Sequence, residues 1–286
     1  RLADMAGRYR ATVKTIEKPW GEWFSLEELE AALIEHKPAI LALVHAETST
    51  GVCQPMEGVG DLCRKHNCLL LLDTVTSLGG VPLYIDEWKV DLAYSCSQKG
   101  LSCPPGLGPF TMGPRAEDKM TSRSGKVPNW YLDVSLLNQY WGSDRVYHHT
   151  APVNMNFGMR EALRLLAEEG LDQAWARHRR NAERLWNGLE RQGLSMHVPE
   201  ERRLPTLTTV RIPDGVDGKA FSQHLLNTHG IEVGGGLGAL AGKIWRIGLM
   251  GYNSTPENVD RLLNLFETEL PRFRDRKSTR LNSSHQ

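Results

Sequence analysis

The sequence lacks an excess of charge of either sign, a long apolar run and a paired cysteine motif. Lysine plus arginine and aspartate plus glutamate each number 34 in 286 residues, so the formal net charge is zero. This balance argues against binding of nucleic acid or a membrane surface through overall charge. The longest apolar runs, such as CLLLL at 68–72, are far shorter than the roughly 20 residues of a membrane-spanning helix. We therefore expect neither nucleic acid nor a membrane as a partner.

The cysteines are odd in number and show no C-x-x-C spacing. The five are Cys53, Cys63, Cys68, Cys96 and Cys103. No histidines fall near them at the spacing of zinc ligands. The pattern predicts reduced cysteines that serve as small hydrophobic residues, and it predicts no metal site.

Both ends of the sequence are unusual. It opens with RLADMAGRYRATV, which has no initiator methionine and no apolar signal core, and Leu2, Met5, Ala6 and Tyr9 follow helical spacing. We expect an N-terminal truncation that begins inside a helix. The polar, aperiodic ending RKSTRLNSSHQ predicts a disordered and foreign tail at 275–286. Without a visible targeting signal, a cytoplasmic location is the default expectation.

The first half of the chain alternates helices with short apolar runs. SLEELEAALIEHKP has a capping box from Ser25 to Glu28 and stops before Pro38, which predicts a helix. A second helix is expected at 56–67. Buried strands are predicted at 39–47, 68–75, 91–97 and 108–113. Continuous apolar strands between helices indicate an α/β fold whose mostly parallel sheet is covered on both faces.

The second half of the chain has a different pattern of predicted helices and strands. Residues 154–192 are predicted to be helical, with Gly170 and Gly193 at the helix ends. Strands at 206–212 and 244–250, a strand with a glycine loop at 231–238, and helices at 218–230 and 255–270 follow. Thr255 and Pro256 are the expected N-cap and first residue of the last helix. We predict a large domain at 1–168 and a smaller α+β domain at 169–274.

An acid and a lysine follow neighbouring strands of the predicted sheet. Asp73 comes directly after the apolar run LLLL, at the strand end where open α/β sheets bind ligands. Lys99 follows the next strand, among Ser95, Ser97 and Gln98. A lysine and a carboxylate together suit pyridoxal phosphate (PLP), whose aldehyde forms a Schiff base with an amine and whose ring nitrogen needs an acid partner. Taken singly, Asp73 is equally a capping residue, and a lysine after a strand is usually a surface residue.

Several separated motifs share one resemblance. They are HAETSTGVCQP, LLLLDTVTSLGGVPLYIDEWKVDLAYSCSQKGLSCPPGLG, VYHHTAPVN, RLPTLTTVRIP, GGGLGALAGKIWRIGLMG and NVDRLL. Together they resemble the alanine–glyoxylate and serine–pyruvate aminotransferases, which are class-V, fold type I PLP enzymes, over residues 1 to about 274. The resemblance implies the PLP-binding large domain, incomplete at its N-terminus, and the C-terminal small domain. It also implies transfer of an amino group from alanine or serine to glyoxylate or pyruvate by a ping-pong Schiff-base mechanism.

The resemblance assigns roles around the cofactor. It implies that Lys99 forms the Schiff base and moves the proton at the substrate α-carbon, and that Asp73 pairs with the pyridine nitrogen. It places Val75 on the ring face, Thr48 near the phenolic oxygen of the ring, and Gln98 at the phosphate.

The resemblance also implies a homodimer with shared active sites. Tyr147 and Thr150, in YHHT, match groups that reach the phosphate of the neighbouring subunit. Arg246, in WRIG, matches the arginine that binds the substrate carboxylate through a bidentate fork. Without the resemblance, Tyr147 is a packed loop aromatic and Arg246 a strand arginine in a surface ion pair. The glycine run GGGLG at 234–238 lacks the ending of a phosphate-binding loop and is expected to form a tight turn.

Departures from the family leave alternatives open. Cys96 stands where the family usually has glycine, and it would be strained if that position required a positive φ. The family's phosphate-binding turn and ring-stacking tryptophan are expected upstream of Arg1. The alternatives are a kynurenine-type transaminase, a cysteine desulfurase or other lyase, and a non-catalytic truncated fragment. A desulfurase needs a nucleophilic cysteine in the smaller domain, whereas all five cysteines lie at or before Cys103. Animal members can carry a peroxisomal signal, which makes the peroxisome the alternative location.

Overall fold

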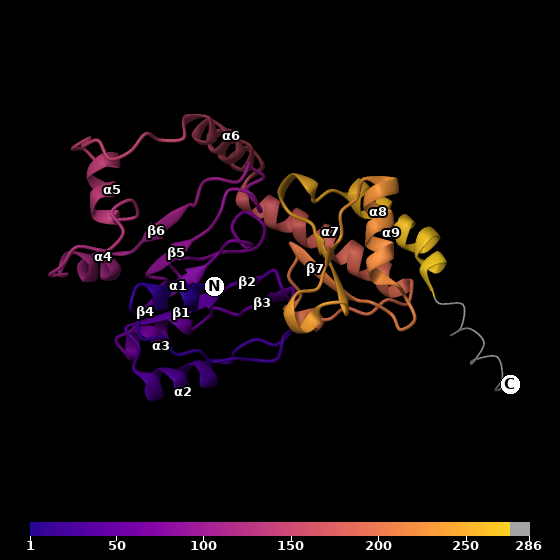
Figure 1. The fold of residues 1–286 in the computed structure, drawn as a ribbon, viewed down its shortest axis with the longest axis horizontal. Helices are drawn as coiled ribbons and strands as arrows, with labels where there is room; N and C mark the ends of the chain where they lie inside the picture. The colour runs from indigo at the N-terminus through magenta and orange to yellow at the C-terminus, as the bar shows by residue number, and fades with distance from the viewer. Residues whose placement is uncertain (275–286) are drawn as a thin grey trace.

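The computed structural model describes residues 1–274, in which a four-stranded and a three-stranded sheet form the centres of two adjoining units (Figure 1). The α-helices are α1 (Leu2–Arg8), α2 (Leu26–His36), α3 (Val59–Lys65), α4 (Pro114–Thr121), α5 (Val134–Trp141), α6 (Val153–Glu169), α7 (Leu171–Arg191), α8 (Gly218–His229) and α9 (Pro256–Glu269). The strands are β1 (Ile40–Val44), β2 (Ala46–Glu47), β3 (Val52–Cys53), β4 (Leu69–Asp73), β5 (Leu92–Tyr94), β6 (Phe110–Met112), β7 (Leu207–Arg211), β8 (Gly234–Gly235) and β9 (Ile244–Gly248). The tail predicted at 275–286 lies outside the described residues.

Local sequence signals explain where several helices begin and end. Both halves of the capping box form at α2, since Ser25 Oγ accepts the N–H of Glu28 and the Glu28 carboxylate accepts the N–H of Ser25. Thr255 caps α9, whose first residue is Pro256, as predicted. Gly170, with φ +83°, separates α6 from α7. α4 begins at Pro114, and Asp133 caps α5 by accepting the N–H of Ser135, yet neither helix was predicted. β2 falls within the strand predicted at 39–47, whereas its antiparallel partner β3 was not predicted.

The large sheet has the order β1-β4-β5-β6. β1, β4 and β5 are parallel, as predicted, and Val44, Asp73 and Tyr94 lie side by side in register. β6 is antiparallel to β5, because the loop 95–109 returns the chain from the same end of the sheet without a crossover helix. That loop carries Lys99, so the lysine lies at the carboxyl end of the parallel strands.

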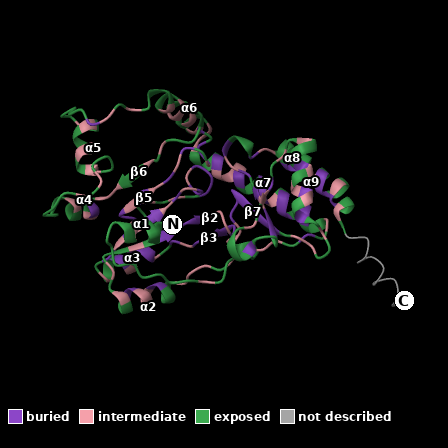
Figure 2. Cartoon of the chain, viewed as in Figure 1, coloured by how far each residue is buried: buried purple, intermediate pink, exposed green. Residues whose placement is uncertain are grey.

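One face of the large sheet is better covered than the other. Leu70 and Leu72 of β4 are fully buried with apolar residues of α2 and α3, whereas Leu69 and Leu71 are only partly buried. Phe110 of β6 is 50% exposed. Within residues 1–274 the prediction of two covered faces is therefore wrong. Residues of α2 and α3 pack with Leu70 and Leu72, which alternate along β4 and so point to one face. β6, at the edge of the sheet, is largely exposed and drawn in green (Figure 2).

A buried ion pair ties α4 to the start of two strands. Asp91, 3% exposed, accepts the Leu70 N–H at 2.8 Å and two hydrogen bonds from Arg115 at 3.1 and 2.9 Å. Arg115 also donates to the Cys68 carbonyl at 3.0 Å. Both oxygens of the carboxylate thus accept hydrogen bonds, and one donor is a cation, which lowers the cost of burying the charge.

The smaller unit is built around an antiparallel sheet of order β7-β9-β8. Its core contains Phe221, Trp245 and Phe266, whose rings meet edge to face with centroids 5.0 to 5.5 Å apart. Trp245 Nε1 donates to the Gly218 carbonyl at 3.0 Å, so its polar atom is satisfied on burial. The tight turn expected at 234–238 is partly wrong, because Gly234 and Gly235 form β8.

No helix within residues 1–274 is long and apolar enough to cross a membrane. The predicted helix at the start of the chain is present as α1, but none of its residues is buried. The five cysteines are free, as predicted.

Candidate active site

Asp73 ends β4 with both carboxylate oxygens held. Its Oδ1 accepts the Val75 N–H at 2.9 Å, and its Oδ2 accepts the phenol proton of Tyr94 from the neighbouring strand β5. Burial, together with the bond to Asp73, raises the pKa of Tyr94, so the phenol keeps the proton that it donates. Asp73 thus supports the following turn, as expected of a capping residue, and it also places a half-buried carboxylate at the ligand-binding edge of the sheet.

The loop after β5 is fixed by its serines, and its lysine is left unpaired. Ser95 Oγ donates to the Thr74 carbonyl at 3.0 Å, and Ser97 Oγ donates to the Pro104 carbonyl at 2.7 Å. Lys99 is half-buried, and its amine has no hydrogen bond or ion pair with any described residue. The predicted polar collar therefore shapes the backbone and leaves the amine available. Gln98 is exposed.

Cys96 fits its place in this loop without backbone strain. Within the described chain its φ is not positive, and its Sγ lies 3.9 Å from the Val75 carbonyl oxygen. Burial raises the pKa of the Cys96 thiol, which keeps it protonated. The strained residue of the loop is Ser102, with φ 56°. Gly100 is required next to the lysine, because a Cβ there would lie 2.3 Å from the Leu78 carbonyl oxygen.

Arg246 lies on β9 and contacts the turn between β2 and β3. Its Nε donates to the Gly235 carbonyl at 2.7 Å, and its NH1 donates to the Thr48 carbonyl at 3.2 Å. It forms no ion pair among the described residues, so the surface-pair alternative is not supported. A guanidinium has five N–H groups, and these two bonds leave three for a ligand. Thr48 and Arg246, 198 residues apart, are thereby brought together.

Tyr147 and Thr150 form a pair of their own. Their hydroxyl oxygens lie 3.0 Å apart, and Tyr147 is 71% exposed. They belong to the segment from α5 to α6, which runs outside the large sheet (Figure 1). No hydrogen bond among residues 1–274 joins either hydroxyl to Asp73 or Lys99.

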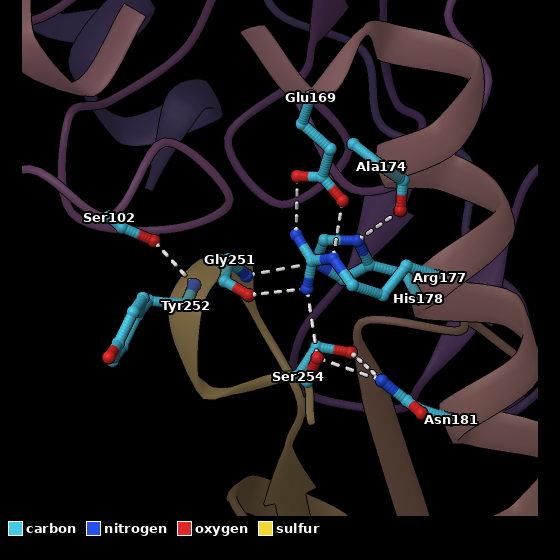
Figure 3. A network of polar contacts seen from close by, with 9 residues as sticks. All are labelled: Ser102, Glu169, Ala174, Arg177, His178, Asn181, Gly251, Tyr252 and Ser254. Atoms are coloured by element: carbon cyan, nitrogen blue, oxygen red, sulfur yellow. Dashed lines mark hydrogen bonds and ion pairs between the residues drawn. The ribbon is translucent and has the colours of Figure 1, made fainter. Parts of the chain in front are cut away.

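Helix α7 holds the turn that follows β9 (Figure 3). Arg177 forms a two-pronged ion pair with Glu169, in which NH2 lies 2.9 Å from Oε2, and this pairing lowers the pKa of Glu169. Its NH1 donates to the carbonyls of Gly251 and Ser254, each at 2.9 Å. One guanidinium therefore fixes both ends of the turn.

His178 completes this support from the interior. Its Nε2 accepts the Gly251 N–H at 2.8 Å, and its Nδ1 donates to the Ala174 carbonyl at 2.7 Å, an arrangement that requires the neutral ring. Burial lowers the pKa of His178, which favours the same form. Asn181 donates to the Ser254 carbonyl at 2.8 Å (Figure 3).

The same turn contacts the lysine loop. Ser102 lies three residues after Lys99, and its Oγ accepts the Tyr252 N–H at 2.8 Å (Figure 3). Sequence reasoning missed this network, because its partners are mostly backbone groups and leave no motif. The loop that carries Lys99 and the turn after β9, the strand of Arg246, are consequently fixed relative to each other.

The side chains at this edge suit PLP. An unpaired amine, a fixed carboxylate one strand away and a guanidinium with three remaining N–H groups match, respectively, an aldehyde, a ring nitrogen and a substrate carboxylate. Val75 lies two residues after Asp73 and is partly exposed, as a side chain that covers a ring face must be.

Comparison with known proteins agrees with this fit. The family model described as aminotransferase class-V matches residues 2–262. The chain is 45% identical over 266 residues to the alanine–glyoxylate aminotransferase of Mus musculus, covering 92% of this chain and 64% of that protein. The chain thus spans about two thirds of the length of the curated relatives that it matches.

Two crystal structures are close in fold. One is an alanine–glyoxylate aminotransferase from Nostoc sp., with 67% identity, a TM-score of 0.92, and coverage of 93% of this chain and 71% of that one. The other is a ureidoglycine–glyoxylate aminotransferase from Bacillus subtilis, with 39% identity, a TM-score of 0.92, and coverage of 95% and 70%. The predicted fold type I architecture is confirmed. The chain belongs to the class-V aminotransferases, a family of PLP-dependent enzymes.

Proposed function

We propose that the protein is a PLP-dependent aminotransferase that moves an amino group from alanine or serine to glyoxylate or pyruvate. The observation that carries the proposal is the unpaired amine of Lys99 in the loop after β5, together with the fixed carboxylate of Asp73 at the end of the neighbouring strand β4. Alanine and glyoxylate are the substrates in the names of several relatives.

The chain would supply the groups that hold the cofactor. When bound, PLP supplies an electron sink for bond breaking at the amino-acid α-carbon. Lys99 would hold its carbonyl carbon, and Asp73 would keep its ring nitrogen protonated. Val75 would cover one ring face, Thr48 would lie near the phenolic oxygen and Gln98 near the phosphate.

Lys99 would also move the proton in the reaction. An amine that is not committed to an ion pair could accept a proton from the substrate α-carbon and deliver it to the carbonyl-derived carbon of the cofactor. The bonds from Ser95 and Ser97 fix the loop, so the lysine side chain would move while its backbone stays in place.

Arg246 would select substrates with a carboxylate. Its bonds to Gly235 and Thr48 orient the guanidinium plane, which leaves a fork for two parallel N–H···O bonds. Both an amino acid and a 2-oxo acid offer such a carboxylate, so one arginine serves both halves of a ping-pong reaction.

We propose a homodimer in which Tyr147 and Thr150 reach the phosphate in the partner's site. Their exposure and their isolation from the lysine site within residues 1–274 support a role outside their own subunit. We also propose that 1–168 form the cofactor-binding large domain and 169–274 the smaller domain. The distinct cores of the two units support this division.

Chemical trapping tests the role of Lys99. The 286-residue chain is incubated with PLP, reduced with borohydride and digested, and the labelled peptide is identified by mass spectrometry. We expect the label on Lys99, its loss in Lys99→Ala, and its retention in Lys65→Ala, where the altered lysine is 65% exposed and pairs with Glu30. Label on another lysine would overturn the assignment.

Activity separates the enzyme from the remaining alternatives. Amino transfer from alanine or serine to glyoxylate, absent in Lys99→Ala, is the expected result. A chain that binds no PLP and transfers no amino group would instead be a non-catalytic fragment. Sulfide release from cysteine would indicate a desulfurase, although residues 169–274 contain no cysteine to serve as its nucleophile.

A further inference from the structure

Two imidazoles and a carboxylate converge at the C-terminal ends of α8 and α9, away from the proposed active site. One ligand atom from each of His224, His229 and Glu269 lies within 4.8 Å of the other two. Both histidines are partly buried, and the side chain of Glu269 is 13% exposed. None of the three has a role in the proposed aminotransferase reaction.

The hydrogen bonds of His224 permit metal binding. Its Nε2 lies 3.0 Å from Glu269 Oε2, and its Nδ1 lies 3.2 Å from Thr228 Oγ1. A threonine hydroxyl can donate or accept, so it stabilises either neutral tautomer of the ring. With a cation present, Nδ1–H can donate to Thr228 while the lone pair of Nε2 faces the cation. This is the outer contact that metal-binding histidines usually make.

His229 provides the strongest indication that the cluster is incomplete. Its Nε2 is buried and has no hydrogen-bond partner among the described residues. Its carbonyl accepts a hydrogen bond from Arg261 of α9 at 2.7 Å, so the end of α8 is fixed against α9. A buried polar atom without a partner costs free energy, and a cation bound by this ring would remove that cost.

Arg272, which pairs with Glu269, does not prevent a cation from binding to the cluster. Arg272 NH1 lies 2.7 Å from Glu269 Oε2, but the Arg272 side chain is 66% exposed. Because the guanidinium is mostly in solvent, water can replace its bond to Glu269, so the arginine can turn to solvent or to the second carboxylate oxygen.

We propose that His224, His229 and Glu269 form a binding site for Zn²⁺ that ties α8 to α9. Two imidazoles and one carboxylate are a ligand set of zinc, with water in the fourth position. Ligand atoms about 2.1 Å from a tetrahedral ion are about 3.4 Å apart. Closing the cluster around zinc therefore needs movements on the order of 1 Å.

The chain contains a matched control for this site. His66 and Glu30 lie 3.2 Å apart, and the same carboxylate oxygen pairs with Lys65 at 2.6 Å. This group repeats the imidazole, carboxylate and neighbouring cation of the proposed site but has no second histidine. It should not hold zinc.

The experiment is a Zn²⁺ titration of the tag-free 286-residue chain by calorimetry, with metal content measured after dialysis. We expect one zinc per chain, and binding at least about tenfold weaker in His229→Gln and in Glu269→Gln. His229→Gln is the decisive variant, because His229 Nε2 bonds to no other described group and its loss should leave the fold intact, as circular dichroism would verify. His66→Gln should bind zinc as the unaltered chain does.

Co²⁺ distinguishes this site from the cysteines. A cobalt spectrum without thiolate charge-transfer bands, lost in His229→Gln, supports the proposal. The proposal is overturned by thiolate bands, by the absence of zinc binding, or by equal binding in His229→Gln and the unaltered chain. None of these results depends on transamination, so the two proposals stand or fall separately.

Discussion

His45 should make the protein sensitive to acid. The residue lies between β1 and β2 and is 4% exposed, with its ring edge to face on Trp88 at a centroid distance of 5.0 Å. Its Nε2 is 3.7 Å from Cys53 Sγ, and its Nδ1 has no partner among the described residues. Burial lowers the pKa of His45 from 6.5 to about 4, against a small opposing effect of the Glu57 charge.

The sign and size of the effect follow from proton uptake. Above pH 6.5 His45 is neutral in both the folded and the unfolded chain, and the stability is fully present. Below that value the unfolded chain takes up a proton that the folded chain refuses until about pH 4. Each pH unit in this window removes about 1.4 kcal/mol from the free energy of unfolding, which is about 2 kcal/mol at pH 5.

Urea unfolding of the unaltered chain and of His45→Gln, at about pH 7 and about pH 5, measures the effect. The glutamine amide does not titrate, so the variant should lose about 2 kcal/mol less between the two pH values. Other groups, including the buried His178, titrate in both proteins and cancel in the difference. Equal losses in the two proteins would refute the reasoning.

Three further substitutions have defined outcomes. Tyr94→Phe removes the phenol that donates a hydrogen bond to Asp73. PLP titration should show about tenfold weaker binding, a loss of about 1.4 kcal/mol in binding free energy. Unchanged affinity for PLP would show that the phenol does not position Asp73. Asp91→Asn breaks the ion pair with Arg115, whose side chain is 30% exposed, and should lower the urea-unfolding free energy by about 1.5–3 kcal/mol; a loss below about 1 kcal/mol would contradict this account. Gly251→Ala places a Cβ 1.8 Å from Ser102 Oγ at φ +56°, so thermal unfolding should reveal a loss of about 2–3 kcal/mol, and a stable variant would mean that the turn can move.

The local parts of the fold could be read from the sequence. The capping box at Ser25 and the Thr255–Pro256 start of α9 act within one turn of helix, so their residues alone determine them. The direction of β6 could not be read in this way, because it depends on the path of the loop 95–109 and not on the apolar run that forms the strand.

The candidate site, too, could be predicted from the sequence only in part. The positions of Asp73 and Lys99 at strand ends followed from the order of strands along the chain. The bonds from Arg246 to Thr48 and from His178 to Gly251 did not, because their acceptors or donors are backbone groups that every residue carries. The proposed zinc site was not predicted for a related reason, since Glu269 lies 40 residues from His229 in the sequence.

The contact between Ser102 and the turn after β9 bears on how defects in this protein should be interpreted. A substitution in α7, remote from the cofactor edge in the sequence, can displace the turn at Gly251 and through Ser102 alter the approach of the Lys99 amine. Such a variant would fold, bind its ligands and still turn over slowly. A screen that scores only residues touching the ligands would class it as neutral.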